Sequence, residues 1–265
     1  MYPELLRIGN FVISSYGVMV AIAFFVGTYL AEKEWIRKGL DRRVFNNVFI
    51  LALVGAVLGS KLLFIFENIP FNVFISNPIK YLLQRGGFTY YGGFLLSLFL
   101  ILIYLTMIRH PILKAADAIS PPLAIGYAIG RIGCFLVGDD YGKPSNLPWA
   151  MAFPRGTPPT YVGALREHFP YLKIEGPEDM LVRVHPTQIY EIIMMFIVFI
   201  VLFRLRDRLK EGKLFSLYLI LSSLERFLVE FLRITTPSFI PFLTVAQIIS
   251  ILIFILGVFL WKLRK

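Results

Sequence analysis

Seven long apolar stretches restrict the folds that are open to this chain. A hydrocarbon core about 30 Å thick needs roughly 20 consecutive apolar residues in a helix, and each stretch is close to that length. Charged residues make up only 17% of the 265 positions. We therefore predict an all-α, polytopic integral membrane protein with seven transmembrane helices in a single domain, residues 1–265. The expected spans are residues 11–31, 45–66, 90–108, 115–137, 187–203, 214–232 and 242–261.

The charges in the connections predict how these helices are oriented, because Lys and Arg favour the cytoplasmic side. Of the 27 Lys and Arg residues, fifteen lie in connections on one side, nine lie in much longer segments on the other, and three lie within spans. The N-terminus is therefore expected outside and the C-terminus in the cytoplasm. Residues 1–10 lack a basic start followed by an apolar core, so no cleavable signal peptide is expected.

The net charge of +10 could suggest a nucleic-acid partner. The basic residues lie in short connections between apolar spans rather than on one stripe, and we expect no nucleic acid to bind. The single cysteine, Cys134, excludes an internal disulfide and a multi-cysteine metal site. A small buried apolar thiol is the simplest interpretation of Cys134.

One connection on the predicted outer side, residues 138–186, is too long to be a simple link. This outer segment is rich in Gly, Pro and aromatic residues, and long ordered connections usually cover or form a site. A second connection, residues 67–89, contains Pro70, Pro78 and the pair Gly86-Gly87, which indicate a loop with a short interfacial helix. The chain has no visible internal repeat, unlike many secondary transporters.

Ionisable residues inside the spans are candidate functional groups, because a charge in the bilayer is costly. The basic residues in spans are Lys61, Arg131 and Arg226, and the acids in or beside spans are Asp117, Glu191, Glu225 and Glu230. We expect Lys61 to have a structural role. The arginines could pair with the glutamates to join helices, or together form a site.

Helical spacing favours a site near the outer ends of two helices. Tyr127, Arg131, Cys134 and Gly138 share one face of their helix, since they follow one another at intervals of three or four residues. The same spacing relates Ser222, Arg226, Glu230 and Arg233. Two arginines on facing helices provide planar, fork-shaped donors that suit a phosphate.

Several motifs resemble the bacterial prolipoprotein diacylglyceryl transferase family. Residues 130–142 read GRIGCFLVGDDYG, which is similar to the family signature GRxGNFxNGExxG. Residues 185–191 read HPTQIYE, like the family's HPSQLYE, and residues 225–233 read ERFLVEFLR, like its FRFxVEFFR. The matching motifs follow in the family's order along the whole chain, and the family also has seven spans with an external N-terminus.

The resemblance implies an enzyme of the bacterial inner membrane, with its active site facing outward and no cofactor. Its substrates would be phosphatidylglycerol and the lipobox cysteine that follows the signal peptide of a prolipoprotein. The diacylglyceryl group would pass to the thiol, and glycerol phosphate would leave. The resemblance assigns catalytic roles to Arg131, Arg226, Tyr91 and Asp139. It assigns substrate-binding roles to Tyr16, Cys134, Gly142, Gln188, Tyr190, Glu191, Glu230 and Arg233.

Three positions depart from the family pattern. Tyr91 replaces the histidine that precedes the double glycine, Cys134 replaces an asparagine, and Ser222 replaces a tyrosine. The histidine is the usual candidate for activating the thiol, and a phenol, with a reference pKa of about 10, is a poor base at pH 7. Asp139 could accept the proton instead, or nearby arginines could stabilise the thiolate. The sequence leaves the base open.

Two other functions remain open at this stage. A transporter could bind an anionic head group through the same arginines and release it unchanged. A non-catalytic or re-targeted relative could recognise signal peptides or lipids without transferring a group.

Overall fold

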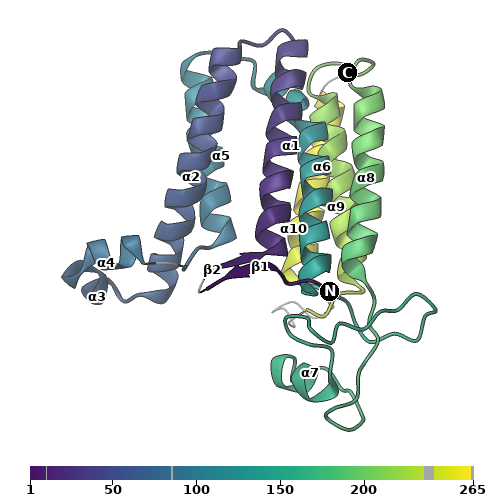
Figure 1. Ribbon diagram of the computed structural model, residues 1–265. Coiled ribbons are helices and arrows are strands. Elements are labelled where there is room, and N and C mark those ends of the chain that lie inside the picture. The colour runs from purple at the N-terminus through teal and green to yellow at the C-terminus, as the bar shows by residue number, and fades with distance from the viewer. Residues whose placement is uncertain (10, 85, 236–241, 264–265) are drawn as a thin grey trace. The chain divides into compact units, whose positions relative to one another are not determined.

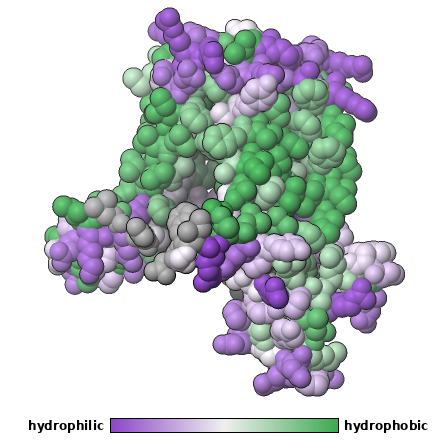
Figure 2. Space-filling model, viewed as in Figure 1, coloured by the Kyte–Doolittle hydropathy of each residue, from purple (hydrophilic) through white to green (hydrophobic). Residues whose placement is uncertain are grey.

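The long apolar stretches form helices in the computed structural model, which describes residues 1–9, 11–84, 86–235 and 242–263. Three of the basic residues counted above, Arg85, Arg264 and Lys265, lie outside the described residues. The long helices are α1 (Ser15–Arg37), α2 (Arg42–Asn68), α5 (Tyr90–Met107), α6 (Ile112–Val137), α8 (Thr187–Leu205), α9 (Lys213–Glu230) and α10 (Val245–Leu263). Apolar side chains cover their middle, and hydrophilic side chains gather toward their ends (Figure 2).

Six of these helices are long and apolar enough to cross a membrane: α1, α2, α5, α6, α8 and α10. This confirms a polytopic membrane protein. The sixth expected span, residues 214–232, forms helix α9, which carries Lys213, Glu225, Arg226 and Glu230 within 18 residues. Because of these charges, α9 is less apolar than the six candidate spans. Arg226 and Glu230 belong to the candidate site described below.

The first helix begins later than the sequence predicted. Residues 11–14 belong to strand β2 (Phe11–Ser14), which pairs antiparallel with β1 (Glu4–Ile8), so the fold has a short hairpin besides its helices. The side chain of Ser14 accepts a hydrogen bond from the amide of Gly17 at 3.1 Å. A serine in this position satisfies an amide that the first helical turn leaves free, which explains why α1 starts at Ser15.

The described chain divides into two compact units, and each is described by itself. The second unit, residues 32–115, contains α2 and α5 with two short helices between them, α3 (Phe71–Ser76) and α4 (Pro78–Leu83). Helices α2 and α5 approach closely where Gly59 faces Gly92, since a Cβ on either glycine would overlap the backbone of the other. Buried Lys61 donates to the carbonyls of Gln84 and Gly86, each at 2.8 Å, which supports the structural role expected for it.

The first unit, residues 1–31 and 116–265, contains α6, α8, α9, α10 and most of α1. Helix α6 has the largest buried share of the six candidate spans, as expected for a helix that contains Asp117, Pro121 and Pro122. The N-terminus and the outer segment lie at one end of these helices, and the last turn of α10 lies at the opposite end (Figure 1).

The outer segment is an ordered structure with its own core. It contains the short helix α7 (Val162–His168) and isolated β-bridges such as Met151 with Val184 and Tyr161 with Leu181. The core residues are Tyr141, Phe153, Val162, Leu165, Val182 and Val184. The segment is therefore a small folded cap that begins where α6 ends and finishes where α8 begins.

Candidate active site

A buried carboxylate, Glu191 on α8, lies at the centre of three arginines of the first unit. Its side chain is 0% exposed. Its oxygens lie 3.0 Å from Arg131 Nε, 3.5 Å from Arg233 Nη1 and 3.8 Å from Arg226 Nη1. One carboxylate cannot balance three guanidinium groups, and buried charges are tolerated only when they are paired. The surrounding acids therefore complete the cluster.

Tyr127, Arg131 and Cys134 lie together on one face of α6, as their spacing predicted. Tyr127 accepts hydrogen bonds from Arg131 Nε at 3.2 Å and Nη2 at 3.1 Å, and its hydroxyl donates to Glu191 Oε1 at 3.2 Å. Cys134 Sγ lies 3.7 Å from Arg131 Nη1. The thiol is buried, and it lies beside the guanidinium group of Arg131.

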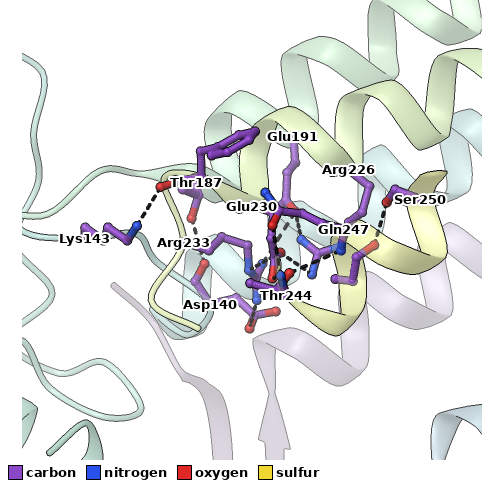
Figure 3. Close-up of polar contacts among 12 residues, drawn as sticks. Asp140, Lys143, Thr187, Glu191, Arg226, Glu230, Arg233, Thr244, Gln247 and Ser250 are labelled. Atoms are coloured by element: carbon purple, nitrogen blue, oxygen red, sulfur yellow. Dashed lines mark hydrogen bonds and ion pairs between the residues drawn. The ribbon is translucent and has the colours of Figure 1, made fainter. Parts of the chain in front are cut away.

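Glu230 on α9 connects Arg226 to the start of α10. One of its oxygens lies 2.7 Å from Arg226 Nη2, and the other accepts from Thr244 Oγ1 at 2.9 Å (Figure 3). Thr244 and Gln247 hydrogen-bond to each other's backbone amides, at 3.2 and 3.0 Å. This reciprocal arrangement is a capping box, which starts helix α10 at Val245. This capping box therefore holds the hydroxyl of Thr244 against Glu230.

Asp140, just past α6, bridges two arginines on the outer side of the cluster. One of its oxygens lies 2.7 Å from Arg131 Nη1. The other lies 2.5 Å from Arg233 Nη2 (Figure 3). Thr187 Oγ1 donates to the carbonyl of Asp140 at 2.7 Å, and Gln188 Nε2 donates to that of Asp139 at 2.5 Å. The first turn of α8 thus fixes the backbone of both acids.

The two neighbouring acids have opposite electrostatic environments. Burial raises the pKa of the Asp139 carboxyl, and the negative charge of Asp140 raises it further. Burial also acts to raise the pKa of Asp140, but the guanidinium groups of Arg233 and Arg131 outweigh it and lower that pKa below its ordinary value. Cys134 Sγ and a carboxylate oxygen of each acid all lie within 4.8 Å of one another. A proton acceptor, Asp139, and an anion, Asp140, therefore lie beside the thiol of Cys134.

Several buried polar atoms of the cluster have no hydrogen-bond partner among the described residues. The donors are Arg226 Nη1 and Arg233 Nε and Nη1, and the acceptors include Asp139 Oδ1, Gln188 Oε1 and Glu191 Oε2. Their charged neighbours are close enough for ion pairing but not aligned for hydrogen bonding. Buried polar groups are normally satisfied, so this cluster has unused capacity for the oxygens of a ligand.

Gly142 lies where the outer segment meets the ends of α8 and α9. Its amide donates to the carbonyl of His185 at 2.8 Å, and it pairs with Arg233 in an isolated β-bridge. A Cβ at this position would lie 2.5 Å from the carbonyl oxygen of Leu232 and 2.8 Å from Thr187 Cγ2. Only glycine fits, and its fit keeps the backbone of Arg233 against the segment that carries Asp140.

Two residues of the first unit that were predicted for the site, Tyr190 and Tyr16, do not contact the three arginines. Tyr190 points toward the outer segment, where its hydroxyl accepts from Trp149 Nε1 at 2.7 Å and lies 3.3 Å from His185 Nδ1. Tyr16, in the first turn of α1, lies beside Gly133 of α6, where a Cβ would be 3.3 Å from its ring. Tyr91, in the second unit, is more than half exposed and packs edge-to-face against Tyr90.

Comparison with known proteins identifies the family. The family description "prolipoprotein diacylglyceryl transferase" matches residues 3–263. The chain belongs to this family. A phosphatidylglycerol–prolipoprotein diacylglyceryl transferase of Clostridium tetani is 31% identical over all of this chain and 98% of its own length. A protein of the same name from Clostridium botulinum is 31% identical over 98% of this chain and 95% of its own length. Another, from Prochlorococcus marinus, is 29% identical over 96% of this chain and 88% of its own length.

Sequence reasoning missed two residues of this transferase-family cluster. Asp140 was passed over because the family signature directs attention to Asp139, although two adjacent acids just past a helix were a visible signal. Thr244 could have been found from the pattern Thr-x-x-Gln before an apolar run, which is the signature of a capping box. Its contact with Glu230 depends on how α9 and α10 pack, and no local pattern shows that.

Proposed function

We propose that this chain transfers the diacylglyceryl group of phosphatidylglycerol to the lipobox cysteine of prolipoproteins in a bacterial inner membrane. The observation that carries the proposal is the cluster of Arg131, Arg226 and Arg233 around buried Glu191, in a chain that belongs to the transferase family. Membership in this family explains why so many charged side chains lie at one end of apolar helices.

The arrangement suits the chemistry of this transfer. The thiolate sulfur attacks the glycerol carbon that bears the phosphate, the carbon–oxygen bond breaks, and glycerol phosphate leaves with the bonding electrons. Negative charge grows on the departing phosphate, so guanidinium donors stabilise the transition state more than the ground state. The nitrogens of Arg226 and Arg233 that have no hydrogen-bond partner among the described residues are donors of this kind.

The thiol proton needs an acceptor, and the closeness of Asp139 to the thiol of Cys134 supports this role. Its Oδ1 atom is buried and unpartnered among the described residues, and burial keeps its pKa above that of an ordinary carboxyl. A base works best when its pKa approaches the working pH. Tyr91 is the second candidate, because it stands where the family usually has a histidine.

We also propose that α9 is the sixth of seven spans, with the N-terminus and the outer segment outside and the C-terminus in the cytoplasm. Arg226 and Glu230 neutralise each other along one face of α9, and the helix packs between α8 and α10. The loop charges favour this orientation, which exposes the arginine cluster to the side where lipobox cysteines arrive.

The test is transfer by the purified protein. Labelled phosphatidylglycerol and a lipobox peptide should yield a lipidated peptide and glycerol phosphate. Arg131→Gln and Arg226→Gln should each lower kcat/KM about a hundredfold or more, the usual effect of removing a transition-state donor. Arg7→Ala is the control, since Arg7 is exposed on β1 and pairs with Glu4 of the same strand.

Thermal unfolding of each variant separates a lost donor from a lost fold. Folded variants that transfer at the wild-type rate would contradict the role given to the arginines. A folded wild type that binds phosphatidylglycerol but forms no product would instead favour a lipid-binding or transport protein.

A further inference from the structure

The carboxylate of Asp140 differs from the other acids of the arginine cluster in its exposure. Glu191 and Glu230 have side chains that are 0% and 2% exposed, whereas that of Asp140 is 43% exposed. Its two oxygens contact two different guanidinium groups, at 2.7 and 2.5 Å. These are the distances of charge-assisted hydrogen bonds to a carboxylate or a phosphate. Asp140 therefore occupies the accessible side of the cluster with the geometry of a bound oxyanion.

We propose that Asp140 is an internal anion that occupies the phosphate position in the free protein and is displaced when the phosphate of the lipid binds. The inference rests on the proposed function, and it adds a residue that competes with substrate and product for Arg131 and Arg233.

The charges of the cluster support displacement rather than addition. Three guanidinium groups are ion-paired with three carboxylates, those of Asp140, Glu191 and Glu230. These acids already neutralise the three arginines, and the carboxyls of Asp139 and Glu225 lie nearby, so a phosphate added to the set would leave negative charge in excess in a partly buried site. If the phosphate takes the place of the Asp140 carboxylate, the balance is kept and no like charges are forced together.

The local structure allows the side chain to leave without moving the loop. Thr187 and Gln188 hold the backbone carbonyls of residues 139 and 140, so the backbone stays fixed. Asp140 has a φ of 57°, in the left-handed region that aspartate tolerates better than most residues. Rotation of a half-exposed side chain about its own χ angles is enough to free both guanidinium groups.

The competition has a consequence for turnover. A phosphodiester carries one negative charge, whereas a phosphomonoester carries about 1.5 to 2 at pH 7. The glycerol phosphate product should therefore bind the arginines more tightly than the lipid substrate does. The return of the Asp140 carboxylate offsets this and speeds release of the product.

The test measures binding of sn-glycerol 1-phosphate to purified protein in nanodiscs, by calorimetry and by inhibition of transfer. Asp140→Asn keeps the size and the left-handed backbone but loses the charge. It should bind glycerol phosphate about tenfold more tightly than the wild type, because the competing state is lost. Its KM for phosphatidylglycerol should fall, and its kcat should fall with it as product release slows. Inorganic phosphate should show the same direction of change.

Two further variants make the result decisive. Asp140→Gly removes the side chain and suits the positive φ, so it preserves the test if Asp140→Asn folds poorly. Glu175→Gln, at an exposed position of the outer segment, removes the same charge and should leave binding unchanged.

Unchanged or weaker phosphate binding in both Asp140 variants would overturn the proposal, because Asp140 would then hold the arginines in place for the ligand. Binding does not require turnover, so the test also separates this inference from the proposed function. Tighter binding in the variants of a protein that transfers nothing would support the internal anion and refute the transfer.

Discussion

At the scale of single residues, Asp139 and Asp140 show how two adjacent carboxyls acquire different roles. Asp140 contacts two guanidinium groups, which hold its pKa below the ordinary value despite partial burial. Asp139 contacts neither arginine directly, and burial together with the charge of Asp140 raises its pKa. Environments that separate the pKa values of neighbouring groups often mark acid and base assignments in enzymes. Asp140 is thus a permanent anion, and Asp139 is able to exchange a proton.

The pH dependence of transfer tests Asp139 as the base. A base must be deprotonated to act, so activity is lost as the pH falls through its pKa. Since the pKa of Asp139 is raised, the acid limb of kcat/KM should lie at higher pH than for a carboxyl with the ordinary value of about 3.9. Asp139→Asn should remove this limb and lower kcat/KM about a hundredfold at pH 7, measured in the lipobox-peptide assay.

The matched variants are Asp139→Glu and Tyr91→Phe. Glutamate keeps the carboxyl and is the residue of the family signature, so Asp139→Glu should retain most of the activity with its acid limb. A large loss in Tyr91→Phe, with an unchanged pH profile in Asp139→Asn, would assign the proton to Tyr91 and contradict the assignment made here.

At the scale of elements, buried Asp117 of α6 caps a helix that is distant in sequence. Its two oxygens accept from the amides of Gly212 and Phe215, each at 2.8 Å, at the start of α9. A carboxylate there satisfies free amides and complements the helix dipole. Asp117→Ala should cost about 2–3 kcal/mol, seen as a lower Tm in detergent, because it leaves those amides unpaired. Asp117→Asn should lie between Asp117→Ala and the wild type, whereas equal Tm values for all three would contradict the capping role.

The elements that the sequence predicted best are those with a strict local period. The faces of α6 and α9 were predicted from spacings of three and four residues, and Arg131 with Tyr127 and Arg226 with Glu230 lie as expected. The start of α1 was wrong, because apolar residues of β2 were taken for helix. Strand and helix differ in period, but four residues are too few to distinguish them beside a long apolar run.

At the scale of the whole molecule, apolar length predicted the helices, whereas their contacts needed the structure. Residues 140, 191 and 233 are far apart in sequence and meet only because the ends of α6, α8 and α9 converge. No periodicity within one element encodes such a meeting. Charges in spans and helical spacing indicated Arg131, Glu191 and Arg233, and the family resemblance assigned them roles. Neither gave a partner for Asp140, which is not part of the signature.

The proposed topology predicts which ends of the helices react with an impermeant reagent. Only one native cysteine must be removed, by Cys134→Ser, before single cysteines are introduced. Lys173→Cys, in the outer segment, should react with a membrane-impermeant maleimide in intact spheroplasts. Lys210→Cys, between α8 and α9, should react only after the membrane is permeabilised; both lysines are exposed, so access alone separates them. If only Lys210→Cys reacts in intact spheroplasts, the orientation is opposite to the one proposed. If Lys173→Cys and Lys210→Cys both react there, α8 does not span the membrane. Because the arginine cluster lies at the end of α6 that continues into the outer segment, the same measurement decides which side of the membrane the candidate site faces.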